Sequence, residues 1–338
     1  MKQDSSVTSF KVASFFSGAG GLDLGFHNAG FDLVWANEYD KSVTPTLRRN
    51  FPNSFVDDRS ITLVQPSDVP DVDGIIGGPP CQSWSEAGAN RGLDDARGQV
   101  FLDYIRLIKA KKPKFFLAEN VAGMLSKTHE GAFQFLISEM EKLGYDFEFR
   151  LLNAADYGVP EDRLRVIFVG YHKDLGKKQF AFPPPFGAKL TLRDAIWDLR
   201  KTAMPAAPGN KTNGKRLKVA NHEYLTGGFS TIYLSRNRVR GWDEQSFTIQ
   251  AGARHAPLHP QAPKMLKIGP NEQIFEPGAE HLYRRLTVRE AARIQTFPDD
   301  FEFIYENVAD GYKMVGNAVA VNFAQAIAAV ILEDLSGS

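Results

Sequence analysis

The sequence predicts an α/β protein with an open, mostly parallel sheet and a second, smaller domain. Short apolar runs alternate with helical patterns through the first half of the 338-residue chain. That alternation is typical of parallel sheets whose crossover connections are helices. It stops near the three prolines of "FAFPPPFGAK" (180–189), which stiffen the chain and remove backbone donors. The segment that follows is basic and irregular, and regular patterns return only near residue 286.

The elements of the first half are expected in a definite order. Apolar runs predict buried strands at 12–18, 32–38, 73–78, 115–120 and 165–171. Helices are expected over 99–112, where apolar side chains share one face, and over 131–144, which ends at a glycine. Ligands of open α/β sheets bind at the carboxyl ends of the strands. Residues directly after these strands are therefore the first candidates for a site.

The later part of the chain divides into fewer regular elements. Thr287 and Glu290 have the spacing of a capping box, which predicts a helix start. The apolar segment 318–335 is expected to form a last helix that packs back on the first domain. The predicted division is a catalytic domain over 1–183 completed by 316–338, a second domain over 190–284, and hinge and bracing segments over 184–189 and 285–315.

Composition narrows the protein class. Hydrophobic residues make up 43% of the chain and charged residues 24%, as in ordinary globular enzymes. One cysteine excludes an internal disulfide framework and suits a reducing cytosol. The polar start "MKQDSSVTSF" lacks a signal-peptide core, and no run reaches the roughly 18 apolar residues of a membrane span. We therefore expect a cytoplasmic protein with no membrane partner.

Charge is distributed unevenly although the formal net charge is zero. Residues 171–284 hold 18 Lys and Arg against 9 Asp and Glu, whereas the remainder holds 22 against 31. A basic half joined to an acidic half indicates a polyanionic partner for the basic half. A merely soluble basic surface explains the same counts about as well.

A glycine loop, "FFSGAGGLDLGF" (15–26), follows the first expected strand. Glycines let the backbone turn sharply and approach a ligand closely. Asp23 stands where the dinucleotide fingerprint requires its third glycine, which disfavours a nicotinamide oxidoreductase. Glu38 ends the second expected strand, where an acidic side chain can bind ribose hydroxyls.

The single thiol, Cys81, lies in the Gly-Pro-rich turn "GGPPCQSWS" (77–85) after the third expected strand. Its neighbours show no apolar periodicity, so a buried structural role is less favoured than a nucleophilic one. Glu119 in "AENV" ends the next strand at the same edge, where it could act as a general acid. Arg163 and Arg165 in "PEDRLRV" lie two residues apart in an extended stretch, which would place them on one side.

These residue types suit methylation of cytosine at C5. Attack by a thiolate at C6 makes C5 nucleophilic, a carboxylic acid at N3 stabilises the developing charge, and an arginine at O2 holds the ring. A sulfonium methyl group is a suitable electrophile and needs no metal. In duplex DNA the base must first rotate out of the stack.

The chain resembles the DNA cytosine-5 methyltransferase family along nearly its whole length. The matching segments, in the family's order, are "FFSGAGGLDLGF", "NEYD", "GGPPCQSWS", "AENV", "RLRV", "RLTVREAARIQTFPDDF" and "GNAVAVNFA". The resemblance implies a Rossmann-like S-adenosylmethionine-dependent sheet with a smaller DNA target-recognition domain. It implies that Cys81 is the nucleophile, that Glu119 binds N3, and that Arg163 and Arg165 orient the flipped cytosine and its phosphate. The implied S-adenosylmethionine contacts are Phe16, Gly18, Gly20, Leu22, Glu38, Ile61, Pro80 and Asn317.

Two positions depart from the family pattern. Glu161 stands where the family often has glutamine, and we expect little effect because both arginines remain. Ser60 stands at the position of an aspartate that usually contacts the adenine amine. Either Asp58 substitutes for that aspartate or the hydrogen bond is lost.

The basic segment resembles the recognition region of the HaeIII methyltransferase, a family member whose target is GGCC. That resemblance implies that Arg236, Arg238 and Arg254 contact bases and that Ile232 inserts near the disrupted stack. Arginine bound to guanine O6 and N7 is the commonest specific base contact, and a GGCC duplex holds four guanines. A phosphate contact is the competing role for any one of these arginines. Phosphate contacts are also expected from Lys211, Lys215, Arg216 and Lys218.

The implied biology is a monomer in the bacterial cytoplasm that protects double-stranded DNA from a restriction endonuclease with the same target. Two alternatives stay open. A tRNA cytosine-5 methyltransferase would carry similar "PPCQ" and "ENV" segments, although the HaeIII-like segment argues against it. An inactive DNA-binding regulator is disfavoured because Cys81, Glu119 and Arg165 are all present.

Overall fold

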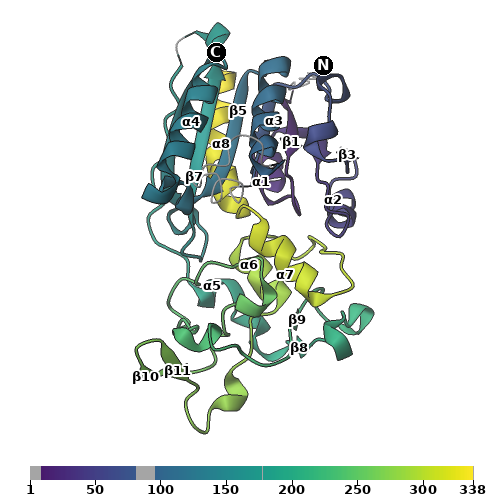
Figure 1. Ribbon diagram of the computed structural model, residues 1–338. Coiled ribbons are helices and arrows are strands. Elements are labelled where there is room, and N and C mark those ends of the chain that lie inside the picture. The colour runs from purple at the N-terminus through teal and green to yellow at the C-terminus, as the bar shows by residue number, and fades with distance from the viewer. Residues whose placement is uncertain (1–8, 81–95, 177, 338) are drawn as a thin grey trace, which may run out of the picture.

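The computed structural model describes residues 9–80, 96–176 and 178–337. Its upper part in Figure 1 is a seven-stranded sheet with helices on both faces. Its lower part holds short helices and two small two-stranded sheets. The predicted α/β sheet is confirmed.

The sheet is mixed rather than wholly parallel. Its strand order is β3-β2-β1-β4-β5-β7-β6, and β7 runs antiparallel to both of its neighbours while the other pairs are parallel. The strands are β1 (Lys11–Phe15), β2 (Asp32–Asn37), β3 (Phe55–Asp57), β4 (Gly74–Gly77), β5 (Phe115–Val121), β6 (Tyr145–Asn153) and β7 (Leu164–His172). All five predicted strands are present. The two further strands are β3, which has only 3 residues, and the edge strand β6, where apolar and charged side chains alternate.

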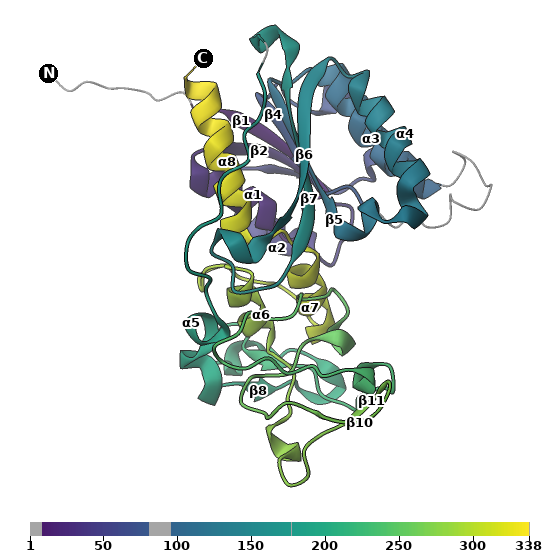
Figure 2. The same cartoon turned by 90° about the vertical axis from the view of Figure 1, so that its left-hand side faces the viewer.

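Helices cover both faces of this sheet, as Figure 2 shows nearly edge-on. The pair α3 (Ala96–Lys111) and α4 (Glu130–Glu141) lies on one face, and α1 (Gly21–Ala29) and α8 (Val321–Ser336) lie on the other. The short helix α2 (Thr44–Asn50) follows β2. Alternate residues of β5 point to opposite faces, so Phe115 and Leu117 join one buried apolar cluster and Phe116 and Ala118 join the other.

The last helix packs on α1, as predicted. A Cβ atom on Gly25 would lie 2.4 Å from the Cβ of Ala324, so only glycine allows this close approach. The stretch Val308–Ser336 is long and apolar enough to cross a membrane by length and composition alone. However, 61% of its most apolar 18-residue segment is buried inside the protein, as in a core helix.

The lower part has less regular structure. Its elements are α5 (Leu192–Ile196), β8 (Met204–Pro205), β9 (Glu223–Tyr224), β10 (Leu266–Gly269), β11 (Glu272–Ile274), α6 (Val288–Ile294) and α7 (Val308–Asn317). The last two of these helices lie between the sheet and the rest of the lower part (Figure 1). The predicted capping box starts α6: the Thr287 hydroxyl accepts from the Glu290 N–H at 3.0 Å, and the Glu290 carboxylate accepts from the Thr287 N–H at 2.8 Å.

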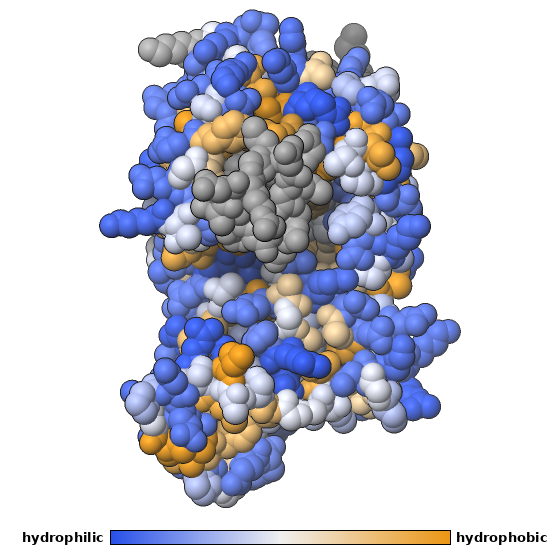
Figure 3. Space-filling view, viewed as in Figure 1, coloured by the Kyte–Doolittle hydropathy of each residue, from blue (hydrophilic) through white to orange (hydrophobic). Residues whose placement is uncertain are grey.

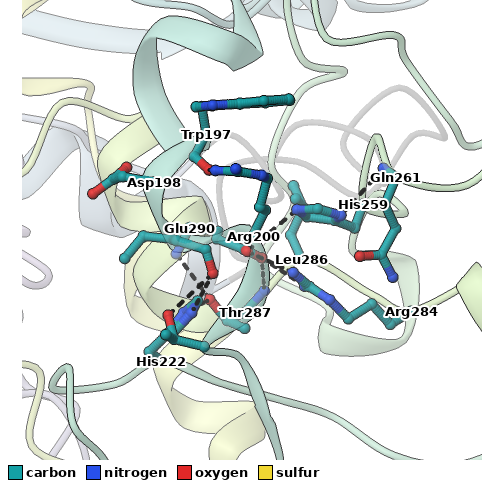
Figure 4. Close-up of polar contacts among 12 residues, drawn as sticks. Trp197, Asp198, Arg200, His222, His259, Gln261, Arg284, Leu286, Thr287 and Glu290 are labelled. Atoms are coloured by element: carbon teal, nitrogen blue, oxygen red, sulfur yellow. Dashed lines mark hydrogen bonds and ion pairs between the residues drawn. The ribbon is translucent and has the colours of Figure 1, made fainter.

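A buried polar cluster around Glu290 braces the lower part (Figure 4). Arg284 donates two hydrogen bonds of 2.7 Å to the Glu290 carboxylate, and His259 Nε2 lies 3.5 Å from it. Burial alone would raise the pKa of Glu290, but the charge of Arg284 lowers it to about 2. Burial lowers the pKa of His259 to about 4. At neutral pH, Glu290 and Arg284 therefore form an ion pair, and the imidazole of His259 beside them is neutral.

Candidate active site

The glycine loop after β1 turns tightly into α1. Phe16, Gly18 and Gly20 have φ angles of 55°, 55° and 91°, in the left-handed region that favours glycine. A Cβ atom on Gly20 would lie 2.4 Å from Phe51 Cε2, so this side of the loop is closely packed. A Cβ atom on Gly18 would meet no described atom within 4 Å. The loop is therefore anchored at Gly20 and leaves its backbone open at Gly18.

Glu38 faces this loop from the carboxyl end of β2. Its two carboxylate oxygens accept from the Gly18 N–H at 2.9 Å and from the Asp40 N–H at 2.8 Å. Burial raises the pKa of Glu38, and these two hydrogen bonds oppose that rise. The next residue, Tyr39, exposes 69% of its surface. Sequence reasoning missed this aromatic ring, although its position beside the expected ribose-binding acid was a usable signal.

The other expected cofactor residues differ in how far they are exposed to solvent. Leu22, in the first turn of α1, and Ile61, in the short turn after β3, are buried. Pro80 follows β4 and is exposed. Asn317 is the exposed last residue of α7. Leu22 and Ile61 can therefore supply an apolar floor, whereas Pro80 and Asn317 are accessible to a ligand.

The structure describes Asp58 and Ser60, the two candidates for the adenine contact after β3. Asp58 is exposed and pairs with Arg48 at 3.1 Å. The Ser60 hydroxyl lies 2.9 Å from the Thr62 hydroxyl, at the start of the turn that carries Ile61. An exposed ion pair of this kind contributes little and is easily broken. Asp58 is thus available to a ligand, and Ser60 offers a hydroxyl there instead of a carboxylate.

Glu119 and Arg165 form an ion pair between neighbouring strands. Glu119 lies on β5 and Arg165 on β7, and the nearest side-chain atoms, Glu119 Oε1 and Arg165 Nε, are 2.6 Å apart. Both side chains are about nine-tenths buried, with exposed fractions of 12% and 11%. Burial lowers the pKa of Arg165 to about 10, so the guanidinium remains charged at neutral pH.

The same carboxylate lies against the loop that leads to the thiol. A Cβ atom on Gly78 would lie 3.1 Å from Glu119 Oε2, so a side chain there would crowd the carboxylate. Asn120 Nδ2 donates to the Pro79 carbonyl at 2.9 Å and ties β5 to this loop. Cys81, the predicted nucleophile, lies outside the described residues. The structure therefore brings together Glu119, Arg165 and the backbone that leads to Cys81.

Arg163 is used differently from Arg165. It is 2% exposed, and its Nη1 and Nη2 atoms donate to three backbone carbonyls at 2.8–3.0 Å, those of Ile249, Gly316 and Ala318. Because β7 begins at Leu164, Arg163 precedes the strand and its side chain points into the protein. The expectation that both arginines share one side of the strand does not match this arrangement.

A pocket of about 250 Å³ opens in the lower part of the molecule. Its lining includes two of the predicted DNA contacts and four polar residues that the sequence analysis did not single out. The lining residues are Arg236, Asn237, Arg238, Phe247, Thr248, Gln250, His255 and Pro257. Arg254 is exposed in the turn Ala253–His255 beside this pocket, and Ile232 exposes 72% of its surface. Thr248, Gln250 and His255 all lie in "FTIQAGARH", a segment in which Arg254 alone was predicted to contact DNA.

The two arginines of the pocket differ in how they are held. Arg238 Nε donates to the Tyr233 carbonyl at 2.9 Å and its Nη2 donates to the Ile232 carbonyl at 3.3 Å. Its guanidinium also lies 4.6 Å from the centre of the Tyr233 ring. Burial, and then the nearby charge of Arg236, lower the pKa of Arg238. Arg236 is exposed and makes no hydrogen bond or ion pair to another residue within 9–80, 96–176 and 178–337.

The surface of the lower part is otherwise mostly polar, as the blue regions of Figure 3 show. The predicted phosphate contacts Lys211, Lys215, Arg216 and Lys218 are exposed there. Apolar side chains gather on the β10–β11 hairpin, where Leu266, Ile268 and Ile274 are exposed (Figure 3).

Comparisons with known proteins show the family of the chain. Residues 10–333 match the family described as C-5 cytosine-specific DNA methylase. The chain is 56% identical to the type II methyltransferase M.NgoPII of Neisseria gonorrhoeae, covering 98% of this chain and 99% of that protein. It is 57% identical to the type II methyltransferase M.MthTI of Methanothermobacter thermautotrophicus, over 96% and 98% of the two chains.

Solved structures share the fold. A crystal structure described as a DNA modification methyltransferase encoded within a prophage of E. coli is 26% identical. It superposes with a TM-score of 0.74 over 97% of this chain and all of that one. The Spodoptera frugiperda DNMT2 structure, at 19% identity and a TM-score of 0.68, has the same fold. The chain belongs to the C-5 cytosine-specific DNA methylase family and is a DNA (cytosine-5-)-methyltransferase.

Proposed function

We propose that the chain methylates the inner cytosine of GGCC in duplex DNA through a covalent adduct between Cys81 and C6. The observation that carries the catalytic part is the pair of Glu119 and Arg165, 2.6 Å apart, beside the Gly78–Pro79 backbone. A carboxyl group and a guanidinium in one partly dry site can bind neighbouring polar atoms of a single ring.

S-adenosylmethionine is the methyl donor that the family uses, and it would supply an electrophilic sulfonium methyl group. The residues at the carboxyl edge fit such a molecule. The open backbone at Gly18 leaves room for it, Glu38 can accept from ribose hydroxyls, and the exposed ring of Tyr39 can stack on the adenine. Pro80 and Asn317 would close the site from the adjacent loops.

We assign the chemical roles as follows. The Cys81 thiolate adds to C6 of the flipped base while protonated Glu119 donates to N3, which stabilises the charge that develops on the ring. Arg165 donates to O2 and holds the ring. After C5 has been methylated, a base removes the C5 proton, the electrons of that bond restore the C5=C6 double bond, the thiolate leaves C6, and N3 returns its proton to Glu119. Arg163 acts behind this site by holding the backbone around it.

Two features support the proposed target: the pocket, and the resemblance of its segment to the recognition region of the HaeIII methyltransferase. Arg236, Arg238 and Arg254 present three guanidinium groups in or beside one pocket, and guanine is the base that arginine contacts best. We propose that residues 190–284 form the target-recognition domain. We also propose that the protein acts as a cytoplasmic monomer and is paired with a restriction endonuclease of the same specificity.

Labelled S-adenosylmethionine and two duplexes test the proposal. One duplex contains a single GGCC, and the other has those four bases scrambled. Label in the GGCC duplex alone is expected, and bisulfite mapping should place it on the inner cytosine. Label in both duplexes would refute the assigned target, and label in tRNA alone would favour the RNA alternative. Cys81→Ala should abolish labelling but keep DNA binding, and turnover near wild type would refute the covalent step.

A further inference from the structure

We propose that Arg163 and Glu161 couple the cofactor site to the DNA-recognition pocket, as positioning residues that contact neither ligand. This inference rests on the proposed roles of Asn317 and of the pocket. Its physical basis is that one buried guanidinium holds backbone from both sites.

The cofactor side of the link is the turn that carries Asn317. Arg163 Nη2 donates to the Gly316 carbonyl at 3.0 Å and to the Ala318 carbonyl at 2.8 Å. These are the two residues that flank Asn317, so a single nitrogen fixes the backbone on either side of it. Any movement of this turn must lengthen at least one of the two bonds.

The pocket side of the link is Ile249, which precedes the pocket residue Gln250. Its carbonyl accepts from Arg163 Nη1 at 3.0 Å, and its N–H donates to Glu161 Oε1 at 2.6 Å. Both backbone groups of this residue are thus held by the buried pair, whose own atoms approach to 3.4 Å.

The two held segments also touch directly. A Cβ atom on Gly316 would lie 2.3 Å from the Ala251 nitrogen and 2.3 Å from the Gln250 carbonyl carbon. The segments 249–251 and 316–318 therefore cannot shift independently without losing buried hydrogen bonds or this packing. A ligand that fixes one segment reduces the freedom of the other, which favours the second ligand.

The catalytic strand is tied to the same point. The Arg163 N–H donates to Asn153 Oδ1 at 3.0 Å, and the Arg163 carbonyl accepts from the Ala154 N–H at 2.9 Å. Two residues further on, Arg165 pairs with Glu119. Arg163 thus makes hydrogen bonds to the cofactor turn, to the pocket segment and to the chain that precedes β7.

The test measures the dissociation constant of a GGCC duplex with and without saturating S-adenosylhomocysteine. The ratio of the two values is the coupling factor, which we expect to be on the order of tenfold for the wild type. Arg163→Lys removes the forked donor, and Gly316→Ala forces the two segments apart without changing charge. Both variants should bring the ratio to within about twofold of unity.

Two matched variants separate coupling from general damage. Arg289→Lys also removes a buried guanidinium that donates to backbone carbonyls, those of Ala220, Pro298 and Phe301. Gly311→Ala also creates a clash on α7, but with the Tyr305 and Val288 side chains. Both controls should keep the wild-type ratio even if their melting temperatures fall. If the lysine variant does not fold, the two alanine variants decide the question.

Several results would overturn the coupling role. They are a wild-type ratio of unity, an unchanged ratio in Arg163→Lys and Gly316→Ala, or an equal loss in the controls. In those cases each ligand still binds alone, so the proposed function survives. If the wild type binds neither ligand, the proposed function fails and the coupling inference fails with it. The same factor must also appear when the two ligands exchange roles, because coupling of binding is reciprocal.

Discussion

The two pocket arginines should contribute unequally to target discrimination, because only Arg238 is hydrogen-bonded to other described residues. We consider Arg236→Ala and Arg238→Ala. The first removes an exposed guanidinium that makes no hydrogen bond or ion pair to another described residue. The second removes one that donates to the Tyr233 and Ile232 carbonyls at 2.9 and 3.3 Å.

The expected magnitudes follow from these contacts. A bidentate contact between arginine and guanine contributes about 1–3 kcal/mol of discrimination, or about 5- to 150-fold. Arg238 is only 7% exposed, so we expect it to move outward to reach a base and to release its two hydrogen bonds, which have a net value of about 0.5–1.5 kcal/mol each. If these two hydrogen bonds are released only on the correct target, their loss offsets about 1–3 kcal/mol of the discrimination that the guanine contact provides. Arg236→Ala should therefore lose the full discrimination, and Arg238→Ala at least about 1 kcal/mol less.

Unfolding of the free protein provides an independent check. Arg238→Ala should lower the free energy of unfolding by about 1–3 kcal/mol through the same two bonds. Arg236→Ala should change it by less than about 0.5 kcal/mol.

The binding assay is competition at fixed salt between the GGCC duplex and duplexes with one base pair changed, since salt alone alters affinity. Equal loss of discrimination in the two variants, together with equal stability, would refute the reasoning. Uniform loss on all duplexes would instead make the substituted arginine a phosphate contact.

Three further predictions concern catalysis, the loop and pH. Glu119→Gln should lower the methylation rate by about 10²- to 10⁴-fold while the duplex still binds, and turnover near wild type would exclude the acid role. Gly20→Ala should weaken S-adenosylhomocysteine binding and lower the free energy of unfolding by about 1–3 kcal/mol. The reason is that φ of Gly20 is 91° and the new Cβ would lie 2.4 Å from Phe51. Calorimetry that shows neither loss would contradict this prediction. Burial lowers the pKa of His259 from 6.5 to about 4, so the unfolded chain binds the extra proton between these values. The free energy of unfolding should therefore fall by on the order of 3 kcal/mol as pH drops from 6.5 to 4. Denaturant unfolding at several pH values should show a smaller fall for His259→Gln than for the wild type.

Much of the fold and part of the site were accessible from sequence because they depend on local periodicity and on residues that follow strands. Five strands were predicted to within three residues at each end. The glycine loop and Glu38 meet because both follow neighbouring parallel strands, which is a general property of such sheets. The capping box of α6 depends on a spacing of three residues and was equally visible.

Other features depend on partners that are remote in the chain. Glu119 pairs with Arg165 because β7 inserts antiparallel beside β5, a placement that no local pattern specifies. Arg163 and Arg165 have the same residue type and lie two residues apart, yet one donates to the carbonyls of Ile249 and Gly316 while the other pairs with a carboxylate.

The sequence by itself therefore indicated the candidate residues for cytosine methylation and the edge of the sheet at which they were expected to gather. The tertiary structure decided which of two similar arginines pairs with Glu119 and which one holds backbone carbonyls. It also decided that Arg238 is held by two carbonyls, while Arg236 has no hydrogen bond or ion pair to another described residue. The physical reason is that hydrogen-bond acceptors become partners only when packing brings distant backbone within about 3 Å.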